Sequence, residues 1–334
     1  MRHKKDQKYR NGFEKTMRII SGTEYFQIEE RTAVALGKFD GIHLGHRALL
    51  NRILEQKKQG LLAVVFTFEP APAAFFAGKS LPELTTREEK RVLFEEMGID
   101  VLIEFPMNAK TAATPPEEFI RQYLAGQMHM AFLAAGEDLS FGDKGKGNCE
   151  LLASFSHVYD YRMEIIEKVK YHGKDPAYHG VEVSSTLLRS LVEQGKMEVV
   201  AELLLDDYSF YGEVVHGKQL GRTLGMPTVN ICPKTDKLLP AFGVYYSKVI
   251  VGTGEDMKCY KAITNIGYKP TVDDTKTPVV ESYLYNFQGD LYGKHIRVQL
   301  LSYRRPEMKF ESVDALKAQM QQDIQSGLVY HGIG

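Results

Sequence analysis

The chain has 334 residues, of which 43% are hydrophobic and 25% charged, and this length favours two domains over a single core. Its formal net charge of −1 does not indicate nucleic acid or an anionic membrane as a bulk electrostatic partner, so any phosphate binding must be local. The longest apolar run, residues 61–68, is too short to span a bilayer. The three cysteines form no CxxC pair, which disfavours a zinc site or a disulfide framework and fits a reducing cytoplasm.

The first 16 residues are basic, but the apolar segment of a secretory signal does not follow them. Met17 then opens MRIISG, which has the form of a fresh start before the first apolar segment. We therefore expect residues 1–16 to be a disordered extension or a misassigned start. A nucleic-acid-binding arm is the alternative, and it is disfavoured because no further basic patch accompanies it.

The first half of the chain alternates strands and helices. Continuous apolar runs predict buried strands at residues 32–37, 61–68, 100–105 and 128–136. Periodic apolar spacing predicts helices at residues 46–60, 87–98, 115–126, 186–195 and 197–205. Thr86 with Glu89, and Thr114 with Glu117, have the spacing of a helix-capping box. This alternation predicts a parallel sheet that helices cover on both faces.

The pattern changes after Leu205, where helical periodicity largely stops. Strand-like runs separated by Gly, Pro, Asn and Asp follow at residues 210–217, 243–252, 259–267, 279–287 and 296–303. They predict an antiparallel barrel or sandwich. A last helix is expected at 312–327 with Ser312 as its N-cap. We place the domain boundary near 205–210, which gives domains at 17–206 and 207–334.

The stretch GKFDGIHLGH, residues 37–46, joins the first predicted strand to its helix. Ligands of an open α/β sheet bind beyond the carboxyl ends of the strands. The glycines permit a tight turn, and the free N–H groups at the start of the helix favour phosphate. His43 and His46 can stabilise the charge of a phosphoryl group under attack, as nucleotidyl transfer requires. The alternative, a glycine turn with two incidental histidines, is disfavoured by the aspartate and the regular glycine spacing.

This stretch resembles the signature of the FMN adenylyltransferase half of the bacterial bifunctional riboflavin kinase/FAD synthetases. Further segments resemble that family in the same order, namely TFEP (67–70), AGEDLSFG (135–142) and SSTLLR (184–189). The resemblance implies flavin binding by Asp138. It implies binding of the nucleotide and its phosphates by Gly37, Phe39, Asp40, Gly45, Ser184, Ser185, Thr186 and Arg189. Taken alone, SSTLLR is more often a capped helix with a surface arginine, and the segment gains weight only beside GKFDGIHLGH. Ala71 replaces a histidine frequent in the family, and we expect activity to survive this change.

A second informative stretch, residues 212–231, reads GEVVHGKQLGRTLGMPTVNI. Gly217, Gly221 and Gly225 permit a loop whose backbone amides wrap phosphates. Thr228 and Asn230 lie two apart, so on a strand they share a face and offer the hard oxygen ligands that Mg²⁺ prefers. The alternative is a barrel hairpin with turn glycines. The stretch resembles the PTAN motif of riboflavin kinases, with Val229 in place of alanine.

Two further residues gain a role from the same resemblance. Glu281 lies on an apolar strand, where a carboxylate is costly unless it is partnered or functional. The resemblance makes it the general base for the ribityl 5′-hydroxyl, whereas the alternative is a satisfied edge-strand glutamate. Arg305 is expected either to contact flavin or to form a salt bridge at the start of the last helix.

The resemblance implies a Rossmann-like α/β nucleotidyltransferase domain followed by an antiparallel β-barrel riboflavin kinase domain with a C-terminal helix. It implies a cytoplasmic enzyme that converts riboflavin and ATP to FMN, then FMN and ATP to FAD and pyrophosphate, both with Mg²⁺. One rival class is a nucleotidyltransferase that makes a CDP-alcohol or a coenzyme A precursor, and the kinase motif argues against it. The other is a non-catalytic flavin-binding regulator, which would need fewer of these residues. We expect the two sites to act independently of each other.

Overall fold

The computed structural model describes residues 16–217, 225–269 and 277–333. The expected N-terminal extension, apart from Thr16, and the predicted phosphate-loop Gly221 lie outside these residues. Two compact units emerge from the contacts of the chain. Of the described residues, the first unit contains 16–38, 48–79 and 90–167, and the second contains 39–47, 80–89 and those from Lys168 to Ile333.

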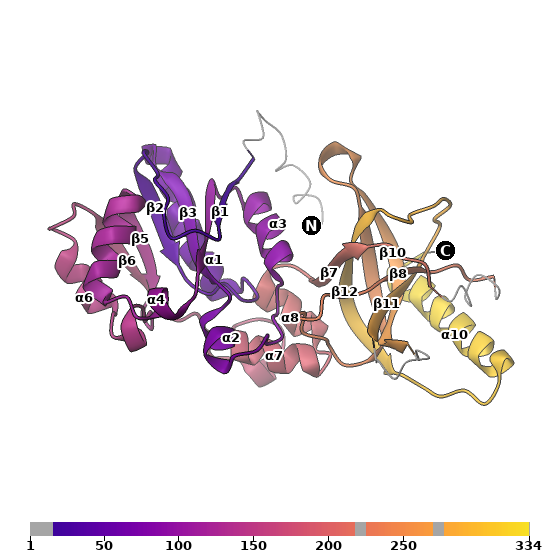
Figure 1. Ribbon diagram of the computed structural model, residues 1–334. Helices are drawn as coiled ribbons and strands as arrows, with labels where there is room; N and C mark the ends of the chain where they lie inside the picture. The colour runs from indigo at the N-terminus through magenta and orange to yellow at the C-terminus, as the bar shows by residue number, and fades with distance from the viewer. Residues whose placement is uncertain (1–15, 218–224, 270–276, 334) are drawn as a thin grey trace. The chain divides into compact units, whose positions relative to one another are not determined.

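The first unit is built on a six-stranded parallel sheet of order β1-β4-β3-β2-β5-β6 (Figure 1). Its strands are β1 (Arg18–Ser21), β2 (Thr32–Leu36), β3 (Leu62–Glu69), β4 (Val101–Pro106), β5 (Met130–Gly136) and β6 (Arg162–Ile166). The four central strands confirm the sequence predictions. The sequence did not predict β1 and β6, because these edge strands are short and leave most of their residues at least partly exposed.

Helices and short helical turns connect these strands. They are α1 (Leu44–Gln56), η1 (Lys57–Gln59), α2 (Pro72–Ala77), α3 (Arg87–Met97), α4 (Ala109–Ala112), α5 (Pro116–Phe119), η2 (Ile120–Gln127), η3 (Asp143–Gly145) and α6 (Cys149–Phe155). The expected start at Thr114 with a Glu117 box is wrong by one residue, since Pro115 is the N-cap and has no capping side chain. The segment η2 continues α5 as a π-helix.

Both faces of the parallel sheet are buried, which confirms the prediction of a parallel sheet that is covered on both faces. On one face, Val34, Phe66 and Ile103 pack against Phe119 and Leu152 of the connecting helices. On the other face, alternate strand residues such as Ala33, Ala35 and Val65 are fully buried as well. A parallel sheet requires this cover because its strands are apolar on both sides.

The second unit contains a six-stranded antiparallel sheet of order β7-β12-β9-β10-β11-β8. Its strands are β7 (Tyr208–Glu213), β8 (Val229–Ile231), β9 (Gly243–Val251), β10 (Lys258–Lys269), β11 (Thr277–Leu284) and β12 (His295–Pro306). The chain just after β7 returns to the opposite edge, where the Val215 N–H donates to the Asn230 carbonyl at 2.8 Å. The sheet therefore curls into a barrel rather than a sandwich.

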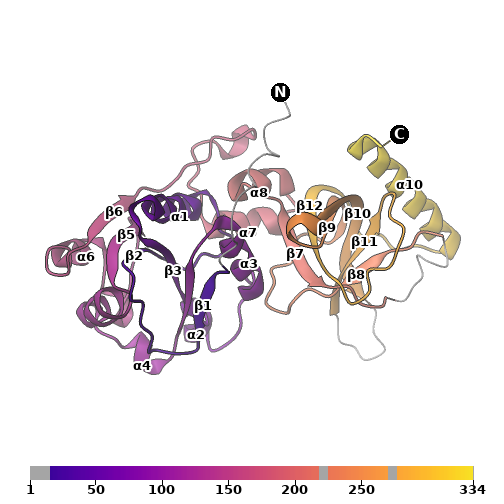
Figure 2. The same ribbon diagram turned by 90° about the horizontal axis from the view of Figure 1, so that it is seen from above.

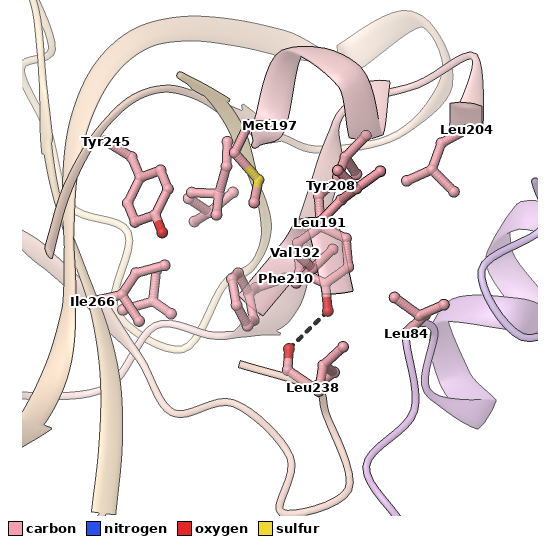
Figure 3. Close-up of a cluster of buried hydrophobic side chains, with 14 of the residues drawn as sticks. Leu84, Leu191, Val192, Met197, Leu204, Tyr208, Phe210, Leu238, Tyr245 and Ile266 are labelled. Carbon is pink, nitrogen blue, oxygen red and sulfur yellow. Dashed lines mark hydrogen bonds between the residues drawn. The ribbon is translucent and has the colours of Figure 1, made fainter. Parts of the chain in front are cut away.

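Helices of this unit pack against its antiparallel sheet. The helical segments of this unit are η4 (Pro176–Tyr178), α7 (Ser185–Glu193), α8 (Met197–Leu204), η5 (Gly254–Asp256) and α10 (Val313–His331). Residues of α7 and α8 share one core with Tyr208, Phe210 and Tyr245, and the Tyr208 hydroxyl donates to the Leu238 carbonyl at 2.7 Å (Figure 3). The last helix, α10, lies along one side of the sheet (Figure 2), and Ser312 caps it as expected.

Candidate functional site

The loop between β2 and α1 carries the predicted histidines in an unusual backbone conformation. Phe39, Gly41 and Ile42 all have positive φ angles, of 50°, 90° and 42°. The two non-glycine side chains are buried, with 0% and 1% exposure. Such left-handed conformations cost free energy for ordinary residues and persist where the surroundings fix them, which is typical of functional loops.

Asp40 is the residue that fixes this loop. Its Oδ1 accepts hydrogen bonds from the backbone N–H groups of Leu84 at 2.8 Å and Thr85 at 3.2 Å. Its Oδ2 forms an ion pair with Arg189 at 2.5 Å, and its backbone carbonyl accepts from the Ser185 hydroxyl at 2.8 Å. The structure thus brings Asp40, Ser185 and Arg189 together. It adds the backbone of Leu84 and Thr85, whose contact with Asp40 the sequence did not indicate.

The imidazole rings of His43 and His46 stack with their centroids 3.8 Å apart and their planes 17° from parallel. The His46 backbone N–H donates to His43 Nδ1 at 3.4 Å, and a Cβ at Gly45 would come within 3.3 Å of the His43 ring. Burial lowers the pKa of His46 well below its usual value, and the neighbouring charge of His43 lowers it further. His46 is therefore neutral near pH 7, and its buried Nδ1 has no hydrogen-bond partner among the described residues.

The other residues that the sequence predicts for this site lie at the start of α7, just after β2 and just after β5. Ser184 caps α7 by accepting from the Leu187 N–H at 3.2 Å, and Thr186 is exposed in the first turn. Gly37 belongs to the first unit, where its N–H donates to the Phe66 carbonyl at 3.2 Å. Asp138 also belongs to that unit and lies exposed in the turn after β5.

A second group of predicted residues meets at the edge of the barrel. The Thr228 hydroxyl donates to Glu281 Oε1 at 2.5 Å, and Asn230 pairs with Glu281 across the β8–β11 ladder. Gly217 packs so closely on Asn230 that an added Cβ would lie 2.6 Å from its Nδ2 atom. Gly225 has a φ of 79°, which favours glycine. A hydroxyl, an amide and a carboxylate therefore converge, and their hard oxygen atoms suit Mg²⁺.

Arg305 forms the salt bridge that the sequence left open, although its partner lies within α10 rather than at the helix start. Its guanidinium pairs with Asp323 at 2.6 Å, and Arg304 contacts the same carboxylate at 2.9 Å. Burial raises the pKa of Asp323, but hydrogen bonds from the two arginines outweigh this effect and lower it. The pair joins the end of β12 to the last helix.

Fold and site together define a protein class in which a nucleotidyltransferase with an HxGH motif, here residues 43–46 of the loop between β2 and α1, is joined to a barrel kinase. The chain matches the FAD synthetase family over residues 26–186 and the riboflavin kinase family over residues 204–330. A bifunctional riboflavin kinase/FMN adenylyltransferase from Buchnera aphidicola is 33% identical, covering 92% of this chain and 97% of that protein. One from Escherichia coli K12 is 34% identical, covering 91% and 94%. The chain belongs to the bifunctional riboflavin kinase/FMN adenylyltransferase family.

A solved structure shares the fold along most of the chain. It is described as a macrolide-efflux protein from Streptococcus pneumoniae, is 27% identical, and has a TM-score of 0.78 over 93% of this chain and 98% of that one. In the part of the present chain that the structure describes, no helix is long and apolar enough to cross a membrane.

Proposed function

We propose that this chain makes FAD from riboflavin in two steps, each at its own group of residues. The barrel phosphorylates riboflavin with ATP to FMN and ADP, and the HxGH loop adenylylates FMN with ATP to FAD and pyrophosphate. The observation that supports this most directly is that one chain holds both the Thr228–Glu281 pair beside Asn230 and the stacked His43–His46 loop. A nucleotidyltransferase of another specificity would not need the first group.

In the kinase step, Glu281 is proposed as the general base. Its carboxylate takes the proton of the ribityl 5′-hydroxyl as that oxygen attacks the γ-phosphorus of ATP and ADP leaves. Thr228 already donates to this carboxylate, so the side chain is held in one orientation. Thr228 and Asn230 would hold Mg²⁺, which neutralises phosphate charge when bound. Backbone amides near Gly217 and Gly225, with Gly221 outside the described residues, are proposed to bind the phosphates.

In the adenylyl step, a phosphate oxygen of FMN attacks the α-phosphorus of ATP and pyrophosphate leaves. The nucleophile is already an anion, so the protein positions the reactants and stabilises charge rather than removing a proton. His43, His46 and the free N–H groups at the start of α1 are proposed to meet the transferring phosphate.

The remaining residues of the adenylyl site are proposed to complete nucleotide and flavin binding. Arg189 holds Asp40 in this structure and is proposed to stabilise the leaving pyrophosphate. Nucleotide contacts are assigned to Gly37, Phe39, Asp40, Gly45, Ser184, Ser185 and Thr186. Flavin contacts are proposed for Asp138 and, in addition to its salt bridge with Asp323, for Arg305. We further propose domains at 17–206 and 207–334, and a cytoplasmic location, which the cysteine pattern favours.

The test is a time course of purified protein with riboflavin, ATP and Mg²⁺, followed by chromatography of the flavins. We expect FMN to appear first and then to give way to FAD. His46→Ala should suppress FAD formation and spare FMN formation, and Glu281→Ala should do the reverse when FMN is supplied. If either substitution removed both activities from a folded protein, this division of roles would be wrong. Saturable riboflavin binding without any product would instead favour a flavin-binding regulator.

A further inference from the structure

The segment 80–89 links the HxGH loop to a part of the chain that follows β8. The Glu83 N–H donates to the Asp236 carbonyl at 2.5 Å, and the Leu238 N–H donates to the Glu83 carbonyl at 2.8 Å. These two bonds pair the segment with residues 236–238 in the sequence half that carries the kinase motif. All of these residues lie in the second compact unit.

Lys237 is the centre of this link, and it is nearly inaccessible to solvent. Its side chain is 3% exposed and its ammonium pairs with Glu89, 5% exposed, at 2.6 Å. The ammonium also lies 4.4 Å from the centroid of the Tyr208 ring. A buried charge is tolerated only when it is paired and hydrogen-bonded, so these partners restrict Lys237 to one position.

The same ammonium reaches the backbone that holds Asp40. Lys237 Nζ donates to the Leu84 carbonyl at 2.8 Å, while the N–H of the same peptide group, that of Thr85, donates to Asp40 at 3.2 Å. One peptide group is therefore bound at its oxygen by a cation and at its nitrogen by an anion. Hydrogen bonds arranged in such a chain polarise and strengthen one another. The Leu84 N–H adds a second bond to Asp40 at 2.8 Å.

We propose that Lys237 is a positioning residue for adenylyl transfer: it fixes residues 84–85, which fix Asp40, which fixes the loop that carries His43 and His46. This inference rests on the proposed function. The loop needs such support because Phe39 and Ile42 adopt left-handed conformations that relax when their surroundings loosen. A displacement of about 1 Å at the histidines is enough to slow transfer by about two orders of magnitude.

The experiment compares Lys237→Met with Lys234→Met in the full-length protein. Lys234 pairs with Glu88 at 3.5 Å between the same two segments, but both side chains are mostly exposed, so it is a matched control. For each variant, FAD formation from FMN and FMN formation from riboflavin are measured separately. Because Lys237→Met leaves Glu89 buried without its partner, a second variant, Lys237→Met with Glu89→Leu, removes both charges.

For Lys237→Met or the paired variant, we expect kcat for FAD formation to fall at least about tenfold while KM for FMN changes less than about threefold. The kinase rate should stay within about twofold of the parent, and Lys234→Met should leave both rates unchanged. Unchanged FAD formation in a variant that retains kinase activity would overturn the inference. Loss of both activities together in both variants would also overturn it, since Lys237 would then only hold the fold. Absence of FAD formation in the parent protein would instead refute the proposed function.

Discussion

Asn230 lies so close to Gly217 that the substitution Gly217→Ala is expected to disable the kinase step. An added Cβ would lie 2.6 Å from Asn230 Nδ2, so one of the two must move about 0.8 Å to reach ordinary contact near 3.4 Å. Asn230 is 5% exposed and pairs with Glu281 across the ladder, so its displacement disturbs the proposed metal ligand and the base together. A misplacement of this size costs about two orders of magnitude in rate, or about 2.7 kcal/mol of transition-state stabilisation.

The assay is FMN formation from riboflavin and ATP, with FAD formation from supplied FMN as the internal control. Gly254→Ala is the matched substitution, because a Cβ there would meet nothing within 4 Å and the φ of 57° strains only the turn. It should cost about 1 kcal/mol of stability and leave both rates intact. Full kinase activity in a folded Gly217→Ala variant would refute the reasoning, and so would an equal loss of both activities.

Three further substitutions test single contacts. Asp40→Asn removes the charge opposite Arg189, so FAD formation should fall about tenfold with the kinase rate kept; equal rates in parent and variant would contradict this. The pKa of His46 in the folded protein is lowered from about 6.5, so below that pH the unfolded chain binds a proton at His46 that the folded protein does not, and the free energy of unfolding falls. His46→Gln should reduce the loss of stability between pH 7.5 and 5.5, as measured by urea denaturation. The pKa of Asp323 is lowered from 3.8, so its contribution to the free energy of unfolding is present above about pH 4 and is lost as the pH falls below that. Asp323→Asn should lower the free energy of unfolding by about 3 kcal/mol at pH 7, because it leaves Arg305 without its ionic partner.

Helix caps were predictable from the sequence, because each depends on residues only a few positions apart. The Thr86–Glu89 capping box forms in both directions, at 2.9 and 3.4 Å, and Ser184 and Ser312 cap their helices. Each needs only a spacing of three residues and an adjacent helix. The edge strands β1 and β6 were missed because a partly exposed strand has no continuous apolar run, and its place is decided by the neighbour that it pairs with.

For the candidate site, the sequence indicated the residues that lie within recognised motifs but not the partners that hold them in place. The motifs assign Asp40, Ser185 and Arg189 to one ligand, and the structure places Ser185 and Arg189 in contact with Asp40. Its hydrogen bonds to Leu84 and Thr85 had no sequence signal, because backbone N–H groups are the same in every residue but proline. The sequence likewise offered two roles for Arg305, and only the structure supplied Asp323, 18 residues away, as its partner.

Glu89 shows why a correct local prediction can be physically incomplete. Its Oε2 accepts from the Thr86 N–H at 2.9 Å, as the capping box requires, and a solvent-exposed helix start would need nothing more. Here the carboxylate is buried, and the same oxygen takes the ammonium of Lys237, 148 residues away, at 2.6 Å. A cap alone does not compensate a buried charge, so burial makes the remote cation necessary. That requirement ties residues 80–89 and the HxGH loop to the residues after β8, and no pattern within either half of the sequence contains it.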